Sequence, residues 1–202
     1  MISPRRAESL LLPPIDRNEV LRYWGAFSPT EETSALLDSC LDECREVFTP
    51  RVVFAKTPLA FSGATVDMGF ASVDCPALAA HLDGCREEVV FAATVGIGID
   101  RLIRRHSTLS PARASCLQAI GTERIEALCD AFEEKIGREE GETVSRFSPG
   151  YGSLPLSLQK DIFAFLDCPR AVGISLGDSL LMTPTKSVTA IIGIRDPSRS
   201  IK

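Results

Sequence analysis

The sequence lacks any apolar run that approaches the roughly twenty residues a helix needs to cross a bilayer. It also lacks an excess of positive charge, because 22 lysines and arginines stand against 27 aspartates and glutamates, for a net charge of -5. A protein that binds nucleic acid usually carries a basic face for the phosphates. These two absences predict a protein whose partners include neither a membrane nor a nucleic acid.

We also expect no secretory signal at the N-terminus. Arg5 and Arg6 precede three leucines, but this run ends at Pro13 and Pro14 and is too short for the apolar core of a signal peptide. We therefore interpret residues 1–15 as a flexible or docking arm, and we expect a cytoplasmic protein.

Cysteine patterns that hold metals are scarce as well. The chain has 7 cysteines but no Cys-x-x-Cys, and its 2 histidines are His81 and His106. Cys40 and Cys44 lie one helical turn apart, but without such a pattern we expect no structural zinc site. The odd number of cysteines and their positions inside apolar patterns predict reduced thiols, most of them in the core.

What the sequence does contain is a series of helical patterns. Asp16-x-x-Glu19 is a capping box that predicts a helix from Arg17 to about Trp24, ended by Gly25. Later helices are indicated by apolar residues at spacings of three and four. We expect Ser72 or Asp74 to cap the helix predicted over residues 75–82. The later helices are predicted over residues 30–47, 75–82, up to 105, 110–136 and 153–166.

Stretches rich in Val, Ile and Phe predict strands between the helices. Residues 51–57 and 65–70 are joined through Pro58 and Gly63 and are predicted to pair, while 88–95 has the continuous apolar run of a central strand. Further strands are predicted at 171–176 and 187–194. Together these patterns favour an α+β fold, a single domain over 16–195 with a twisted, mostly antiparallel or mixed sheet flanked by helices, and a polar tail at 196–202.

Gly96-Ile97-Gly98 follows the central strand and resembles the start of a dinucleotide-binding fingerprint. The third glycine of that fingerprint would fall at Arg101, and the next predicted element is a helix where the fingerprint needs a strand. We therefore interpret the glycines as a tight strand-to-helix turn.

The loop Arg146-Phe147-Ser148-Pro149-Gly150-Tyr151-Gly152 has the composition of a binding loop. Pro149 fixes its own φ and the glycines permit close backbone approach, so backbone groups can be held in fixed directions. Arg146 offers a planar fork for a carboxylate or phosphate, and Tyr151 offers an aromatic face. The alternative is an ordinary turn with a surface arginine and a half-buried tyrosine.

One acid on the helix before this loop is set apart from the others. Glu126, Glu133 and Glu134 fit a solvated helix face, whereas Asp130 lies between Cys129 and Ala131 beside the apolar stripe. We expect Asp130 to point along the edge of the core towards Arg146.

The motifs, taken in order, resemble the activation (reactivation) domain of cobalamin-dependent methionine synthase in its free-standing form. Residues 146–151 are similar to the Arg-x-x-x-Gly-Tyr loop with which that domain binds S-adenosylmethionine. Residues 174–184 resemble its Leu-Thr-Glu-Ser-x-x-Met-x-Pro stretch, 187–190 its Ser-Val-Ser-Gly strand, and 91–100 the Ala-Thr-Leu-Gly stretch of the free-standing proteins. The resemblance covers roughly residues 16–195.

The resemblance implies a cofactor-binding role for five residues and no catalytic or metal-binding residue. Arg146 would hold the methionine carboxylate, and Tyr151 would line the site. Ser148 would contribute backbone groups where the family has alanine, within a turn made possible by Gly150. Asp130 would bind the ligand's amino group where the family has a longer glutamate.

The implied function is reactivation of a separate cobalamin-dependent methionine synthase, by reductive methylation of inactive cob(II)alamin. S-adenosylmethionine would supply the methyl group, the partner protein would carry the cobalamin, and a donor such as flavodoxin or ferredoxin would supply the electron. The chain would then be a methyltransferase component that acts only together with a corrinoid protein, because the cofactors carry the chemistry.

Four departures from the family pattern keep other interpretations open. The family's N-terminal acid and C-terminal tyrosine have no assigned counterpart, and Asp130 and Asp178 each replace a glutamate. One alternative is a module that docks on a corrinoid protein without binding S-adenosylmethionine. Another is a reactivation factor for a different corrinoid methyltransferase. A redox role for the cysteines would need an exposed thiol of low pKa, which the pattern does not indicate.

Overall fold

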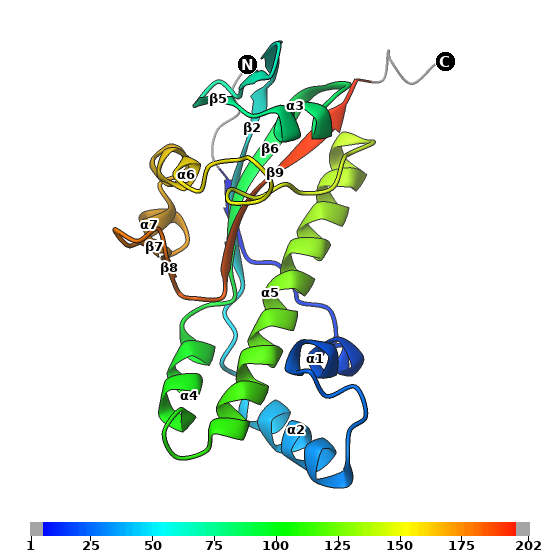
Figure 1. Ribbon diagram of the computed structural model, residues 1–202, viewed down its shortest axis with the longest axis vertical. Helices are drawn as coiled ribbons and strands as arrows, with labels where there is room; N and C mark the ends of the chain where they lie inside the picture. The colour runs from blue at the N-terminus through cyan, green and yellow to red at the C-terminus, as the bar shows by residue number, and fades with distance from the viewer. Residues whose placement is uncertain (1–5, 197–202) are drawn as a thin grey trace.

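A four-stranded antiparallel sheet forms the middle of the protein in the computed structural model, which describes residues 6–196 (Figure 1). The strands follow the order β1-β2-β6-β9, so the longest strand, β6, is paired along both sides. They span Arg6–Glu8 (β1), Arg51–Pro58 (β2), Cys85–Thr94 (β6) and Ser187–Arg195 (β9). The predicted α+β class is confirmed, and the pairing within this sheet is antiparallel throughout.

Both faces of this sheet are buried. In β6, Val89 and Phe91 belong to one hydrophobic core, whereas Val90 and Ala92 belong to a second core on the opposite face. This alternation explains the continuous apolar run, because every side chain of a doubly covered strand leaves water. The prediction of a central strand at 88–95 is confirmed.

The core on the face that carries Val89 and Phe91 is built with four helices, of which α5 lies along the sheet. The longest, α5, has 30 residues, which at the usual rise corresponds to about 45 Å. In Figure 1 it runs beside the sheet and extends past its lower end, where the other three helices pack around it. The four are α1 (Arg17–Trp24), α2 (Glu31–Glu43), α4 (Gly98–His106) and α5 (Pro111–Glu140).

Smaller elements cover the other face, which carries Val90 and Ala92. They include three short helices, a three-stranded sheet and a two-stranded hairpin. The helices are α3 (Pro76–His81), α6 (Leu158–Leu166) and α7 (Cys168–Ala171). The strands are β3 (Ala60–Ser62), β4 (Thr65–Asp67), β5 (Ser72–Asp74), β7 (Ser175–Leu176) and β8 (Met182–Thr183). No helix within residues 6–196 is long and apolar enough to span a membrane.

The local signals place α1 and α4 as predicted. The capping box of α1 is only half formed, because the N–H of Asp16 donates to Glu123 and the Glu19 carboxylate binds Arg22. The Asp16 carboxylate accepts hydrogen bonds from the backbone N–H groups of Asn18 and Glu19, and Gly25 ends α1 with a φ of +78°. The turn into α4 is tight, since a Cβ placed at Gly98 would lie 2.2 Å from the carbonyl oxygen of Val47. The interpretation of these glycines as a strand-to-helix turn is confirmed.

The predicted pairing of 51–57 with 65–70 is wrong. β2 pairs with β1 and β6, while β4 pairs with β3 and β5 in the separate three-stranded sheet. The physical reason is burial: β2 is apolar on both faces and therefore belongs inside the main sheet. β3 is exposed along its whole length.

Three predicted boundaries also differ. The cap of α3 is Cys75, whose Sγ accepts from the backbone of Leu78, and neither Ser72 nor Asp74 has this role. The helix expected from 153 begins at Leu158, after a series of turns that includes Pro155. Most of the strand expected at 171–176 is absent, because the four-residue α7 ends at Ala171 and only β7 follows.

Part of the predicted N-terminal arm belongs to the fold. β1 pairs with β2, with Ala7 opposite Val53, and Leu10, Leu12 and Ile15 pack against the first core. The remainder of the arm, residues 1–5, and the predicted tail beyond Asp196 lie outside the described residues.

A carboxyl group lies inside the second core. Glu88 is fully buried, its Oε1 accepts a 3.1 Å hydrogen bond from Thr57, and its Oε2 has no hydrogen-bond partner among residues 6–196. Burial raises the pKa of Glu88 to about 8, although the bond from Thr57 acts in the opposite direction. The side chain is therefore neutral in the folded protein at mildly acidic pH.

Glu88→Gln should flatten the dependence of stability on pH. Because the pKa is raised on folding, the stability linked to the Glu88 proton is fully present below about 4.5 and is lost as the pH rises through about 8. The free energy of unfolding, measured in urea between pH 5 and pH 9, should therefore fall less in the variant than in the wild type. Glu87→Gln, which changes a partly exposed neighbour, is the control; equal slopes for Glu88→Gln and wild type would contradict the prediction.

Candidate functional site

The predicted binding loop is held against the edge strand of the sheet. Phe147 and Ile191 of β9 exchange backbone hydrogen bonds of 2.8 and 2.9 Å, and the N–H of Val144 donates to the carbonyl of Gly193. Gly150 adopts a φ of +90°, which favours glycine, and its N–H donates to the carbonyl of Leu154. The loop therefore has a defined conformation beside α5.

Arg146 reaches from this loop to three carboxylates on α5. Its guanidinium donates to Glu126 Oε2 at 2.7 Å, to Asp130 Oδ1 at 2.6 Å and to Glu133 Oε2 at 2.8 Å. Spacings of four and three residues place the acids on one face of the helix. Glu133 also accepts from the backbone N–H of Arg146 at 3.0 Å. The expected proximity of Asp130 to Arg146 is confirmed. The assignment of Glu126 and Glu133 to a solvated face is wrong, because both bind Arg146 and both are less exposed than Asp130.

The electrostatics of this cluster favour positive charge. Burial lowers the pKa of Arg146, but its hydrogen bonds to Asp130, Glu126 and Glu133 outweigh burial and raise that pKa. The guanidinium is therefore always charged. With three carboxylates around one cation, the cluster has a formal surplus of two negative charges.

The three acids differ in their access to water. The Asp130 side chain is 63% exposed and contributes one oxygen to Arg146, whereas the Glu133 side chain is 19% exposed and accepts two bonds. Asp130 is thus the carboxylate that a ligand can reach and that can change partner at least cost. Glu133 acts as a fixed support for the arginine.

A cavity of about 640 Å³ opens beside the loop. It is lined by three of the predicted cofactor-binding residues, Arg146, Ser148 and Tyr151. Gly150 shapes the turn without lining this cavity, and Asp130 lines a second cavity described below. The other lining residues are His81, Glu126, Ser145, Phe147 and Val188.

Aromatic rings form one side of this cavity. Tyr151 packs edge-on against Phe147 with ring centroids 5.4 Å apart, and His81 packs against Phe147 at 5.0 Å. His81 Nε2 lies 2.6 Å from the carbonyl oxygen of Ser145, so this nitrogen carries the proton and donates. Most of the Tyr151 ring remains exposed and available to a ligand or partner.

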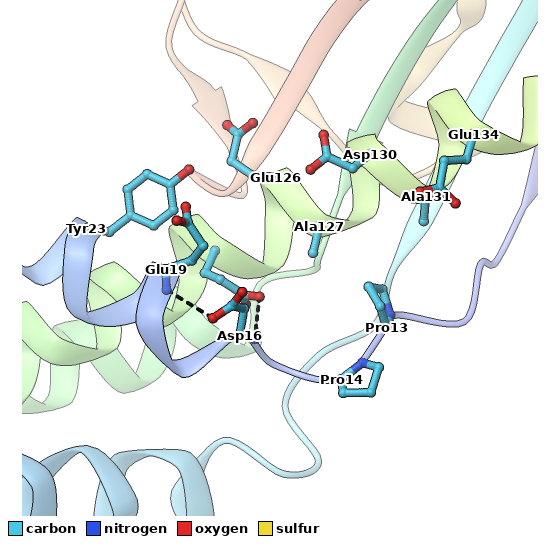
Figure 2. A pocket seen from close by; sticks show the side chains of 11 residues that line it. Pro13, Pro14, Asp16, Glu19, Tyr23, Glu126, Ala127, Asp130, Ala131 and Glu134 are labelled. Carbon is cyan, nitrogen blue, oxygen red and sulfur yellow. Dashed lines mark hydrogen bonds between the residues drawn. The ribbon is translucent and has the colours of Figure 1, made fainter. Parts of the chain in front are cut away.

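A second cavity of about 350 Å³, which we call the acidic groove, lies between α5 and the N-terminal segment (Figure 2). Six of its described lining residues are acids, and none is a lysine or arginine. Four of these acids pair with arginines outside the lining, Glu19 with Arg22, Glu123 with Arg124, and both Glu126 and Asp130 with Arg146. Glu126 lines both cavities, so the groove and the loop cavity share a wall. The described lining consists of Pro13, Pro14, Asp16, Glu19, Tyr23, Glu123, Glu126, Ala127, Asp130, Ala131 and Glu134.

The sequence reasoning missed several residues at this site. Asp16 and Glu19 were recognised only as a helix cap, and Tyr23 and His81 were not singled out for the site. Packing of α1 against α5 brings Asp16 and Glu19 to the groove, more than 100 residues away along the chain. Asp178 lies in the turn between β7 and β8 and lines neither cavity.

The cysteines lie elsewhere and are shielded. All seven are buried and free. Cys129 lies beside Asp130 on α5, and burial raises the pKa of its thiol to about 12. Within residues 6–196, no group of three or more histidine, cysteine, aspartate and glutamate residues is arranged to hold a metal.

The two acids that flank Arg146 should differ in their effect on stability. Asp130→Asn should lower the free energy of unfolding by less than about 1 kcal/mol, because the pair is exposed to water. Glu133→Gln should lower it by about 1–3 kcal/mol, because a shielded acceptor of two hydrogen bonds is altered. Urea unfolding at pH 7 measures both, with the exposed Glu134→Gln as control. An equal loss in the two variants would show that Glu133 does not support the arginine.

One comparison with known proteins identifies a family, and another identifies a shared fold. Residues 80–200 match the family described as "Vitamin B12 dependent methionine synthase, activation domain". Among solved structures, "Crystal Structure of the MetH Reactivation Domain bound to AdoHcy" matches with a TM-score of 0.72 and 16% identity, over 98% of this chain and 80% of that one. Among curated proteins, none matches the sequence.

The structural likeness shows that the fold is shared, and the family match extends over more than half of the chain. The residues matched by the family include the loop at Arg146, the acids of α5 and the edge strand β9. The chain belongs to the family of activation domains of vitamin B12-dependent methionine synthase.

Proposed function

We propose that the chain binds S-adenosylmethionine and supports reductive methylation of inactive cob(II)alamin on a separate cobalamin-dependent methionine synthase. The observation that carries this proposal is the Arg146 cluster, in which a guanidinium and accessible carboxylates meet at two adjoining cavities. An amino acid has a carboxylate and an ammonium group close together, and this cluster offers a partner to each.

The ligand would bind by exchange of ion pairs. Arg146 already has three carboxylate partners, so a ligand carboxylate must replace one, and the exposed Asp130 is the easiest to displace. Asp130 is then free to bind the ligand's ammonium group. Each charge keeps a partner, which limits the cost of removing the groups from water. Glu126 and Glu133 keep the guanidinium oriented throughout.

The remaining predicted residues would shape the loop side of the site. Ser148 lines the loop cavity and would offer its backbone groups, while Gly150 allows the turn that places them. Tyr151 would present its exposed aromatic face to the ligand. None of these groups needs to act as an acid, base or nucleophile, so the protein supplies position and electrostatics.

The bound ligand supplies a methyl group, and its transfer draws forward the unfavourable one-electron reduction of cob(II)alamin. The electron would come from a donor such as flavodoxin or ferredoxin, and the demethylated product is S-adenosylhomocysteine. The chain alone is then a methyltransferase component that binds its ligand with little turnover. Cytoplasmic location and a place in methionine biosynthesis belong to the same proposal.

One observation favours a different function. Because Arg146 is fully engaged by Glu126, Asp130 and Glu133, the cluster is also stable without a ligand. A module that docks on a corrinoid protein without binding S-adenosylmethionine would look the same. A reactivation factor of another corrinoid methyltransferase would share the ligand and differ in its partner.

Thermal unfolding with and without S-adenosylmethionine tests the proposal. Ligand at about a hundred times its Kd should raise the free energy of unfolding by about 2.7 kcal/mol, a shift of several degrees in Tm. Arg146→Ala should abolish this shift. Arg113→Ala is a matched control, because Arg113 has the same side-chain exposure of 22% and an ion pair with Glu43, and lines neither cavity.

The alternatives predict different results in the same experiment. No shift in the wild type at millimolar ligand would reject the proposal in favour of the docking module. A shift in the wild type that survives Arg146→Ala would show that the ligand binds elsewhere. Mixing with a methionine synthase or with another corrinoid methyltransferase, followed by size-exclusion chromatography, identifies the partner.

A further inference from the structure

A buried ion pair lies on α5 next to the acidic groove. Glu123 and Arg124 are 4% and 3% exposed, and the Nε and Nη2 of Arg124 donate to the two carboxylate oxygens of Glu123. Two charges buried this deeply are retained at a net benefit only when their remaining hydrogen-bonding capacity is also used. The partners that use this capacity therefore indicate what the pair does.

Those partners all lie on the N-terminal segment. Arg124 donates to the carbonyl of Pro13 at 2.6 Å and to that of Pro14 at 3.2 Å, and Glu123 accepts from the backbone N–H of Asp16 at 3.0 Å. Neither proline has an N–H, and both lie outside the strands, so no ladder hydrogen bonds hold them. The pair therefore anchors this segment to α5.

The anchored segment is one wall of the acidic groove. Directly after the anchor, Asp16 caps α1, and Glu19 follows in its first turn; both line the groove. The opposite wall is α5 itself, where Glu126 and Asp130 follow Arg124 by two and six residues. Figure 2 shows Asp16 and Glu19 on the segment and Glu126 and Asp130 on α5 around the same hollow. The hydrogen bonds of Glu123 and Arg124 thus act together with the packing of α1 against α5 to hold the two walls in place.

The charge of the groove matters for a ligand whose charge changes in the reaction. S-adenosylmethionine has a sulfonium, an ammonium and a carboxylate, and so one net positive charge. Loss of the methyl group leaves S-adenosylhomocysteine, a neutral thioether with no net charge. The attraction between the sulfonium and the carboxylates falls with distance. The spacing of the two walls therefore determines how strongly the groove distinguishes S-adenosylmethionine from S-adenosylhomocysteine.

We propose that Glu123 and Arg124 are positioning residues that set the preference of the site for the cationic sulfonium over the neutral thioether. They do so by holding Asp16 and Glu19 across from Glu126 and Asp130. The inference rests on the proposed function, since it assumes that S-adenosylmethionine binds at these cavities. It goes further by naming the part of the ligand that the groove recognises and the buried pair that shapes the groove.

Isothermal titration calorimetry of the full chain with S-adenosylmethionine and with S-adenosylhomocysteine tests the inference. The measured quantity is the ratio of the two Kd values, which a general loss of stability does not change. Arg124→Met alone would leave a buried carboxylate unpaired and endanger folding. The main variant is therefore Glu123→Gln with Arg124→Met, which removes both charges, keeps an acceptor for Asp16 and loses the donors to Pro13 and Pro14.

Asp16→Asn is the second variant, because asparagine caps a helix about as well as aspartate and only the charge is lost. Each variant should reduce the preference for the sulfonium by about threefold to tenfold, the effect of one partly solvated charge. Most of the change should come from weaker binding of S-adenosylmethionine. Leu158→Ala, in the core on the opposite face of the sheet, should lower Tm and leave the ratio unchanged.

Each outcome decides a different point. A wild type that prefers S-adenosylmethionine, together with variants that lose this preference, supports the inference. Equal affinity of the wild type for both ligands, or an unchanged ratio in the variants, overturns the inference and leaves the proposed function standing. A wild type that binds neither ligand overturns both.

Discussion

The burial of the central strand β6 on both faces is the constraint on which the rest of the structure depends. Its alternate side chains enter two separate cores, so the chain must supply a layer on each side of the sheet. α5 provides most of the layer on one side, and its length leaves a polar flank beyond the buried stripe. The loop that follows α5 returns along β9 and brings Arg146 over that flank. The site is therefore a consequence of how the sheet is covered.

Two arginines on this frame show opposite uses of a buried charge. Arg124 is buried on α5, where Glu123 and the carbonyls of two prolines accept its hydrogen bonds, so its partners are fixed. Arg146 is only half-buried, and one of its partners, Asp130, is mostly exposed and replaceable. A fixed pair suits the shaping of a wall, whereas an exchangeable pair suits the capture of a charged ligand. The carboxylates of both pairs, Glu123 and Asp130, lie on the same helix within two turns of each other.

Family membership and this arrangement fit together. The match over residues 80–200 includes the elements that carry Arg146, Asp130 and Tyr151, and the shared fold extends to the N-terminal segment. Asp130 contacts Arg146 directly at 2.6 Å. Asp16 and Glu19 of the N-terminal part of the chain line the acidic groove beside these elements.

The sequence by itself determined what depends on near neighbours. The cap and end of α1, the central strand, the long helix and the binding loop follow from local hydrogen bonds, backbone freedom and apolar spacing, which act over a few residues. Even the contact of Asp130 with Arg146 follows from helix spacing and the loop's closeness along the chain. Tertiary structure alone decided that β2 pairs with β6 and not with 65–70, and that Asp16, Glu19, Tyr23 and His81 line the cavities. These contacts join residues far apart in sequence, and they depend on which faces the whole chain can bury together.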